Sequence, residues 1–117
     1  MNKIFYLSSC DTCRKIIRQL PKTTDLVFRD IRQEAITEAE LAAMHQLAGS
    51  YELLFSRKAQ LYKSLGLKEK QLTEMDFKKY ILEHYTFLSR PVFLINNKIF
   101  IGNSNKSVAG AIAELSL

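Results

Sequence analysis

Near its N-terminus the chain reads Ser8-Ser9-Cys10-Asp11-Thr12-Cys13-Arg14-Lys15, and both of its cysteines lie in this segment. The apolar run Ile4-Phe5-Tyr6-Leu7 precedes it, and apolar residues at helical spacing follow it. This order predicts a strand over about residues 3–7, a tight loop, and a helix over about residues 11–20 that ends before a proline. Cys10 would then lie at the N-terminus of the helix, with Cys13 one turn further along.

This position makes Cys10 a candidate nucleophile. The unpaired N–H groups and the dipole of a helix N-terminus favour an anion, and thiols of Cys-X-X-Cys motifs there can have pKa values lowered to about 3.5–7.5. Arg14 and Lys15 add positive charge close by. We interpret Cys10 as a reactive thiolate and Cys13 as its candidate resolving partner.

The two cysteines have three alternative roles: packing in the core, binding of zinc, and a structural disulfide. Buried packing cysteines are one alternative, although both lie outside the apolar periodic positions. A structural zinc site needs two more ligands at close spacing; His45 and His84 are too far apart in the sequence, so we predict no metal site. A structural disulfide would close a very short loop in a chain without an export signal. A Cys-X-X-Cys motif beside a strand and helix is typical of an intracellular redox protein.

The composition is that of one globular domain. The chain has 117 residues, of which 47% are apolar. It shows neither an apolar run of about 20 residues nor a signal-peptide pattern, so we expect a cytoplasmic protein that does not span a membrane. The net charge of +5 comes from basic residues scattered among twelve acidic ones. We therefore predict no direct binding to nucleic acid, and we expect a monomer.

The remaining sequence alternates between strand and helix signals. Leu26-Val27-Phe28-Arg29-Asp30 is predicted to be a second strand, parallel to the first through a right-handed crossover. Thr37 and Thr73 each begin a capping pattern with an acidic residue three positions later, which predicts two helices in the middle of the chain. Gly49 would end the first of them.

The C-terminal part predicts a β-hairpin and a closing helix. Val92–Ile95 and Lys98–Ile101 are β-branched and aromatic, and Asn96-Asn97 between them is a turn signal. A helix over residues 108–115 follows. The order β-α-β, helical insertion, β-β-α is typical of a thioredoxin-like α/β fold. We expect a single domain over residues 1–117, with a mixed four-stranded sheet flanked by helices and an insertion over about residues 37–88.

Three motifs occur in a characteristic order along the chain. They are Cys10–Lys15, Ser56-Arg57-Lys58 through Leu65-Gly66-Leu67, and Ser89-Arg90-Pro91-Val92 before the hairpin. In this combination the chain resembles the arsenate reductase (ArsC)/Spx family over nearly its whole length. In the arsenate reductases of that family a cysteine attacks arsenate, three arginines bind the oxyanion, and glutathione with glutaredoxin completes the reduction.

The resemblance implies roles for individual residues. It assigns the nucleophile to Cys10 and two of the arginines to Arg57 and Arg90. The third arginine would fall near Asn103, and a histidine four residues before the nucleophile is replaced by Tyr6. The candidate catalytic residues are Cys10, Cys13, Arg57 and Arg90; the candidate substrate-binding residues are Tyr6, Thr12, Arg14, Pro91 (expected to follow a cis peptide bond) and Asn103.

Two functions follow from this resemblance. The first is a thiol-dependent reductase of ArsC type that acts on an oxyanion or a disulfide, holds no bound cofactor, and uses glutathione or glutaredoxin as its thiol partner. The second is an Spx-like transcriptional regulator in which a Cys10–Cys13 switch controls binding to the RNA polymerase α-subunit. Cys13 is typical of the regulators, whereas the short sequence after the last predicted helix favours the enzyme. The chain is most similar to the glutathione-linked branch that carries a Cys-X-X-Cys motif.

Overall fold

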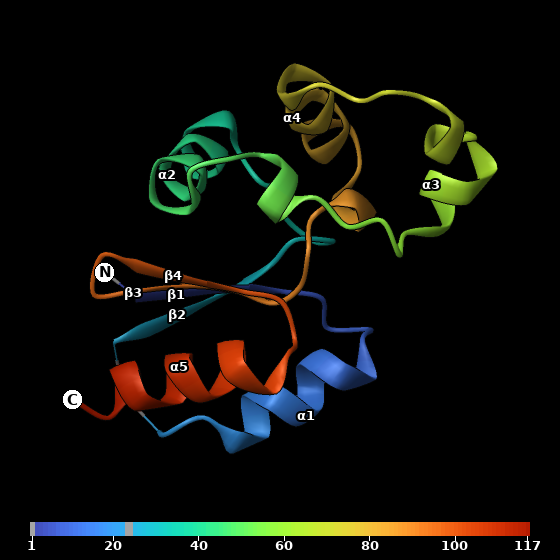
Figure 1. The fold of residues 1–117 in the computed structure, drawn as a ribbon. Helices are drawn as coiled ribbons and strands as arrows, with labels where there is room; N and C mark the ends of the chain where they lie inside the picture. Colours follow the sequence, from blue (N-terminus) through green and yellow to red (C-terminus); the bar gives the residue numbers. More distant parts are fainter. Residues whose placement is uncertain (1, 23–24) are drawn as a thin grey trace. The chain divides into compact units, whose positions relative to one another are not determined.

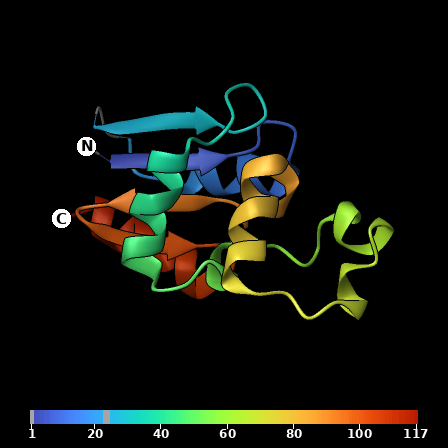
Figure 2. The ribbon, with the colours of Figure 1, turned by 90° about the horizontal axis from the view of Figure 1, so that it is seen from above.

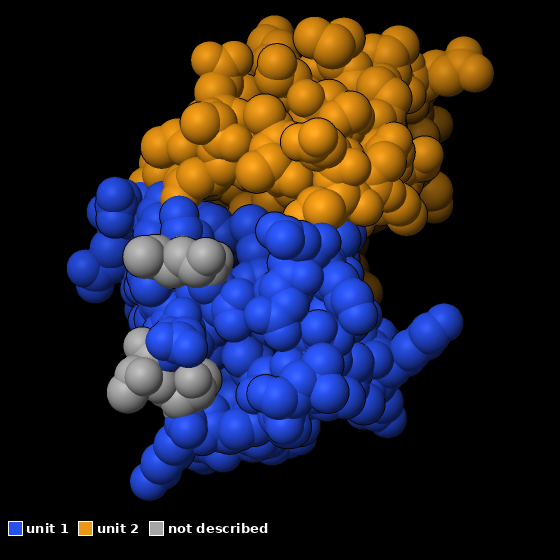
Figure 3. All heavy atoms as spheres, turned by 90° about the vertical axis from the view of Figure 1, so that its left-hand side faces the viewer, with its two compact units in different colours: residues 1–34, 90–117 blue, residues 35–89 orange. Residues whose placement is uncertain are grey.

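The structure is a computed structural model that describes residues 2–22 and 25–117 (Figure 1). The chain divides into two compact units, coloured separately in Figure 3. The first unit combines residues 1–34 with residues 90–117, and the second consists of residues 35–89. The insertion predicted over about residues 37–88 falls within the second unit.

A four-stranded sheet forms the centre of the first unit. Its strands are β1 (Asn2–Tyr6), β2 (Leu26–Asp30), β3 (Val92–Ile95) and β4 (Lys98–Ile101), in the order β2-β1-β3-β4 (Figure 2). β1 pairs in parallel with β2 and antiparallel with β3, and β3 pairs antiparallel with β4. The predicted mixed α/β sheet is therefore confirmed.

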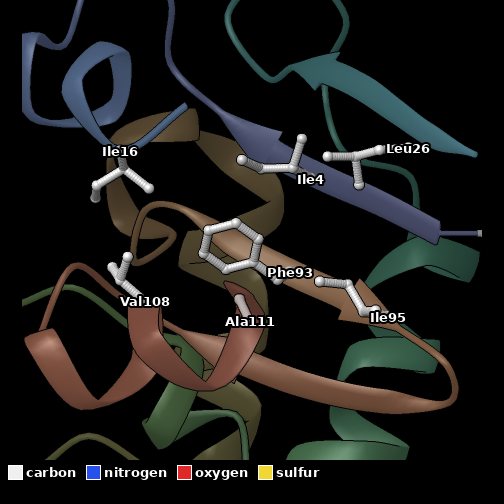
Figure 4. Close-up of a cluster of buried hydrophobic side chains, with 7 residues drawn as sticks. All are labelled: Ile4, Ile16, Leu26, Phe93, Ile95, Val108 and Ala111. Atoms are coloured by element: carbon white, nitrogen blue, oxygen red, sulfur yellow. The ribbon is translucent and has the colours of Figure 1, made fainter. Parts of the chain in front are cut away.

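Two helices of the first unit, α1 (Asp11–Gln19) and α5 (Asn105–Leu115), contribute to its apolar core. Figure 4 shows the buried side chains that meet there from β1, β2, β3 and the two helices. They are Ile4, Ile16, Leu26, Phe93, Ile95, Val108 and Ala111. Burial of this apolar surface is the main favourable term that holds the two helices on the sheet.

Two predicted boundaries are wrong by a few residues. β1 ends at Tyr6 rather than at residue 7, because the carbonyl of Leu7 already accepts the N–H of Cys10 (3.0 Å) and turns the chain out of the sheet. α5 begins at Asn105 rather than at residue 108, because the Ser104 hydroxyl caps the helix by accepting the N–H of Ser107 at 3.1 Å.

The hairpin turn has the predicted position and the backbone that its residues favour. Asn96 and Asn97 have φ angles of 51° and 62°. Two successive positive φ angles match a type I′ turn, and asparagine tolerates this conformation better than most residues do. The turn thus sets the register in which β3 pairs with β4.

The second unit is helical. It contains α2 (Glu38–Ala48), α3 (Gln60–Ser64) and α4 (Glu74–Glu83), with short 3₁₀ helices η1 (Glu52–Leu54), η2 (Leu67–Glu69) and η3 (Tyr85–Phe87). Complete capping boxes at Thr37 and Thr73 begin α2 and α4, and Gly49 ends α2 with a φ of 89°; these predictions are confirmed. No helix in the described ranges 2–22 and 25–117 is long and apolar enough to cross a membrane.

Candidate functional site

Cys10 occupies the N-cap position of α1. Its backbone is extended (φ −94°, ψ 117°), and its carbonyl accepts the N–H of Arg14 at 3.1 Å, the first hydrogen bond of the helix. The Cys10 side chain is partly exposed, whereas that of Cys13 is buried with 1% of its surface exposed. Both cysteines are free thiols. A reagent from solvent can therefore meet Cys10 before it meets Cys13.

The surroundings of Cys10 favour its thiolate. Partial burial of the thiol raises its pKa, but this effect is outweighed by hydrogen bonds from the backbone and thiol of Cys13 and from the backbone of Thr12. The positive charge of Arg90 acts in the same direction. The net effect is a pKa for Cys10 below its ordinary value, as expected for a thiolate that accepts N–H groups at a helix N-terminus.

Cys13 has the opposite character. Burial raises its pKa to about 11; a backbone hydrogen bond from Leu7 opposes this rise, and the charge of Cys10 and the hydrogen bond to Cys10 reinforce it. Near neutral pH the Cys13 thiol is therefore protonated. The two environments push the two pKa values apart, which gives the thiols different chemical roles.

The sheet brings Arg90 to the two cysteines although it is distant from them in sequence. β1 and β3 pair antiparallel with Phe5 opposite Val92, so the chain that leaves β1 lies beside the chain that enters β3. Arg90 is half-buried, its peptide bond to Pro91 is cis, and its charge lowers the pKa of both thiols. The first unit thus assembles an anion-favouring site from Cys10, Cys13, Thr12 and Arg90.

The segment after β4 is hydrogen-bonded to Pro91, the residue that immediately precedes β3. The N–H of Gly102 donates to the carbonyl of the buried Pro91 at 2.8 Å. Asn103 follows in this turn and is exposed. The hydrogen bond joins Pro91 to Gly102, the residue immediately before Asn103.

The family model of the ArsC family matches residues 5–111, which include all of these residues. The chain belongs to the ArsC family. A curated relative, the global transcriptional regulator Spx 2 of Bacillus anthracis, is 26% identical over 108 residues, which are 90% of this chain and 82% of the regulator. A curated relative of this chain thus carries the name of a regulator.

Solved structures agree with the ArsC fold. An arsenate reductase from Vibrio cholerae has a TM-score of 0.73 and 18% sequence identity, covering 97% of this chain and 96% of the reductase. An arsenate reductase (ArsC) related protein from Brucella melitensis has a TM-score of 0.70 and 19% identity, covering 93% and 92% of the two chains. At these identities the likeness shows the thioredoxin-like fold.

Three other residues were predicted for an ArsC site: Arg14, Tyr6 and Arg57. Each of them has contacts of its own. Arg14 donates to the carbonyl of Ser8 at 2.9 Å and forms an ion pair with Asp11, so its guanidinium binds the loop that carries Cys10. The ring of Tyr6 packs edge-on against Phe28, with 6.1 Å between ring centroids, and joins the apolar core.

Arg57 lies in the second unit. Its guanidinium donates to Glu52 at 2.7 Å and lies 5.5 Å from the centroid of the Phe77 ring. The hydrogen bond to Glu52 raises the pKa of Arg57, so the side chain keeps its charge. Glu52 is the local partner that sequence motifs did not indicate.

Asp30, the last residue of β2, was not predicted from the sequence. Its carboxylate accepts the N–H of Arg32 at 3.2 Å, and hydrogen bonding to Ser8 also acts on its pKa. Burial alone would raise the pKa of Asp30, but these hydrogen bonds lower it. The contact with Ser8 spans 22 residues of sequence, and the only available signal was an acidic residue at the end of a strand predicted to lie beside the first.

Within the described residues 2–22 and 25–117, no group of three or more His, Cys, Asp or Glu side chains could hold a metal ion. The two histidines have structural contacts instead. His45 stacks on Tyr51 with 4.0 Å between ring centroids, and the ring of His84 accepts the N–H of Thr86 at 3.2 Å.

Proposed function

We propose that this protein is a thiol-dependent reductase of ArsC type in which Cys10 is the nucleophile, Cys13 is the resolving thiol, and glutathione supplies the electrons. One observation supports this above all: Cys10 is the N-cap residue of α1 and has a lowered pKa, and its neighbour Cys13 is buried and has a pKa raised to about 11. A stabilised thiolate beside a second, protonated thiol is the arrangement that thiol–disulfide exchange requires.

With a disulfide substrate, the first step forms a mixed disulfide. The Cys10 thiolate attacks one sulfur of the substrate, the substrate S–S bond breaks, and the other sulfur leaves as a thiolate. Cys13 then loses its proton to solvent and attacks the Cys10 sulfur. This step expels the second half of the substrate and leaves a Cys10–Cys13 disulfide.

With arsenate, the same thiols carry out a two-electron reduction. The Cys10 thiolate bonds to arsenic, and one arsenate oxygen leaves as water after protonation by solvent. The Cys13 thiolate then attacks the Cys10 sulfur, and the electron pair of the S–As bond passes to arsenic. Arsenite leaves, arsenic has been reduced from the +5 to the +3 state, and the two sulfurs have been oxidised to a disulfide.

In both cases two molecules of glutathione reduce the protein disulfide and become oxidised glutathione, directly or through glutaredoxin. Each thiolate attack transfers electrons between sulfur atoms, so this cycle needs no bound cofactor. The site holds the substrate through Arg90 and the N–H groups of α1, and Thr12, Pro91 and Asn103 lie on the substrate-binding side. Tyr6 and Arg14 remain candidate substrate-binding residues and Arg57 a candidate catalytic residue, and we place the protein in the cytoplasm as a monomer.

The contact between the two thiols also sets the order of the steps. The negative charge of Cys10 is one of the causes that raise the pKa of Cys13. Once Cys10 has formed a covalent bond, this charge and the hydrogen bond to the thiolate are gone, and the pKa of Cys13 falls. Cys13 therefore becomes a better nucleophile after Cys10 has reacted, while burial, the largest cause of its raised pKa, persists.

Mass spectrometry of the intact protein tests this function. The reduced wild-type protein is incubated with arsenate or, separately, with oxidised glutathione, and we expect a Cys10–Cys13 disulfide in both cases. The Cys13→Ser variant should accumulate a glutathione adduct at Cys10, and Cys10→Ser should form neither product. Release of arsenite separates a reductase for arsenate from one for disulfides only. An unchanged reaction in Cys10→Ser contradicts the proposal.

The alternative is an Spx-like regulator, which is favoured by the relative named as a transcriptional regulator. Its Cys10–Cys13 state would control binding to the C-terminal domain of the RNA polymerase α-subunit. The test is a binding measurement with that purified domain and the oxidised or reduced protein. A stable disulfide that switches binding on, without turnover of arsenate or disulfides, would replace the reductase proposal.

A further inference from the structure

We infer that Glu74 is a positioning residue for Arg57. Its carboxylate holds the start of η1, and η1 presents Glu52, whose carboxylate binds the Arg57 guanidinium. The inference rests on the proposed role of Arg57 as a catalytic residue that binds an oxyanion. It adds two acidic residues that lie outside the three ArsC motifs, and all of these residues belong to the second unit.

The Arg57 guanidinium is held by two partners. One of its terminal nitrogens donates to the Glu52 carboxylate at 2.7 Å, and its central carbon lies 5.5 Å from the centroid of the Phe77 ring. Two partners from different elements restrict the many rotamers of a long side chain. The bond to Glu52 uses one of the five N–H donors of a guanidinium, so donors remain for an oxyanion. Arg57 is also half exposed, which lets an oxyanion reach it from solvent.

Glu74 fixes the short helix that carries Glu52. Its two carboxylate oxygens accept the N–H groups of Tyr51 at 2.7 Å and of Glu52 at 3.0 Å. These N–H groups lie at the N-terminus of η1, where backbone donors have no carbonyl partner within the helix. Hydrogen bonds to a charged carboxylate are stronger than those between neutral groups. Glu74 therefore fixes the backbone from which the Glu52 side chain extends.

The helix α4 supports Arg57 in two ways. Glu74 is its first residue, and Phe77, three residues later, lies on the same face of the helix. The Phe77 ring is buried, so it gives the guanidinium a fixed surface. The backbone beside Arg57 is fixed as well, because the N–H of Ser56 donates to the carbonyl of Phe87 at 2.7 Å. Both ends of the Arg57 side chain are thus held.

The substitution Glu74→Gln distinguishes positioning from simple electrostatics. It removes a negative charge from the surroundings of Arg57, and this change alone strengthens the attraction of an oxyanion and lowers the KM for arsenate. The amide NH₂ group that replaces one carboxylate oxygen is a donor, so one of the two N–H groups of η1 loses its acceptor. Glu52 and Arg57 then become more mobile, and the KM for arsenate rises. The two explanations predict opposite signs.

The experiment measures initial rates of arsenite release with arsenate, glutathione and glutaredoxin. For Glu74→Gln we expect a KM for arsenate raised roughly three- to tenfold, as for a weakened charged hydrogen bond, with kcat nearly unchanged. A residue that contributed only to stability would change the amount of folded enzyme, and hence the apparent kcat, but not the KM.

Glu83→Gln is the matched control for the loss of a carboxylate. Glu83 is the last residue of the same helix, is exposed, and forms an ion pair with Lys79 of that helix at 4.0 Å. Its KM for arsenate should equal that of the wild-type protein.

A second variant covers the case in which Glu74→Gln does not fold. Glu52→Gln keeps the backbone bonds of η1 and weakens the bond to Arg57, so it should raise the KM for arsenate by a smaller factor. In an Arg57→Gln background, Glu74→Gln should have no further effect on the KM, because no guanidinium remains to be positioned.

Three outcomes overturn the inference, and they can be distinguished. An unchanged or lowered KM in the folded Glu74→Gln and Glu52→Gln variants removes the positioning role alone, as does an undiminished effect of Glu74→Gln in the Arg57→Gln background. A wild-type KM in Arg57→Gln contradicts the proposed role of Arg57 and the inference with it. A wild-type protein that releases no arsenite contradicts the arsenate step of the proposed function as well.

Discussion

Arg90 carries the charge that acts on both thiols of the site. Its guanidinium lowers the pKa of Cys10 and also that of Cys13. We expect Arg90→Gln to raise the pKa of Cys10, by about one unit or less for a partly exposed pair. Arg90→Lys should keep most of the charge effect but bind an oxyanion less well, because an ammonium group lacks the planar pair of donors.

The measurement is the pH dependence of Cys10 alkylation, combined with the KM for arsenate or a disulfide. Arg18→Gln is the control, because Arg18 is an exposed cation in the last turn of the same helix, α1. An equal shift in Arg18→Gln and Arg90→Gln would show that the net charge of the protein, and not the position of Arg90, sets the pKa.

The sequence predicted the position of the two cysteines on α1 better than the contacts of their neighbours. The position of Cys10 follows from a local pattern of strand, loop and helix. The direction of the Arg14 side chain does not, because Arg14 had two acceptors available, the Ser8 carbonyl and the Asp11 carboxylate, and it uses both. Asp30 was missed because its contact with Ser8 exists only after β1 and β2 have paired.

The capping boxes provide a prediction at the scale of a helix. The Thr73 hydroxyl accepts the N–H of Asp76 at 3.3 Å, and the Asp76 carboxylate accepts the N–H of Thr73 at 2.8 Å. Thr73→Ala removes one of these hydrogen bonds from the start of α4 and should cost about 1 kcal/mol of stability. The measurement is the midpoint of urea unfolding, and Thr73→Ser, which keeps the hydroxyl, is the control. Equal losses in both variants would show that the methyl group matters and the cap does not.

Elements whose signals are local were predicted well. The strand over Leu26–Asp30, the helix starts after Thr37 and Thr73, and the Asn96-Asn97 turn each depend on residues within a few positions of one another. The start of α5 was predicted late, because the capping role of Ser104 was not recognised. Its hydroxyl in fact accepts an N–H at the first turn of the helix.

At the scale of the whole molecule, the chain order explains how distant residues form one site. The first unit is built from residues 1–34 and 90–117. The segment 35–89 is therefore inserted after β2, between the part of the chain that carries Cys10 and the part that begins with Arg90. Antiparallel pairing of β1 with β3 joins these two parts. The sequence order β-α-β, insertion, β-β-α predicted a mixed sheet with a parallel first pair and a C-terminal hairpin, whereas the pairing of β1 with β3 is a finding of the structure.

The two cysteines also make global stability depend on pH, with opposite signs. The lowered pKa of Cys10 adds stability as pH rises through its folded pKa toward the unfolded value, 9.0. The raised pKa of Cys13 has the opposite effect. Its stabilising contribution is fully present below pH 9.0 and is lost between pH 9.0 and about 11, because the unfolded state releases its proton first.

We therefore expect the free energy of unfolding of the reduced wild-type protein to fall more steeply above pH 9 than that of Cys13→Ser. The difference between the two proteins should change by roughly 1–2 kcal/mol between pH 8 and pH 10.5, since each unit of pKa shift corresponds to about 1.4 kcal/mol. Urea unfolding in the presence of a reducing agent measures it. Because lysines and tyrosines titrate alike in both proteins, parallel curves would show that Cys13 has an ordinary pKa, and the proposed order of the two thiol steps would lose its physical basis.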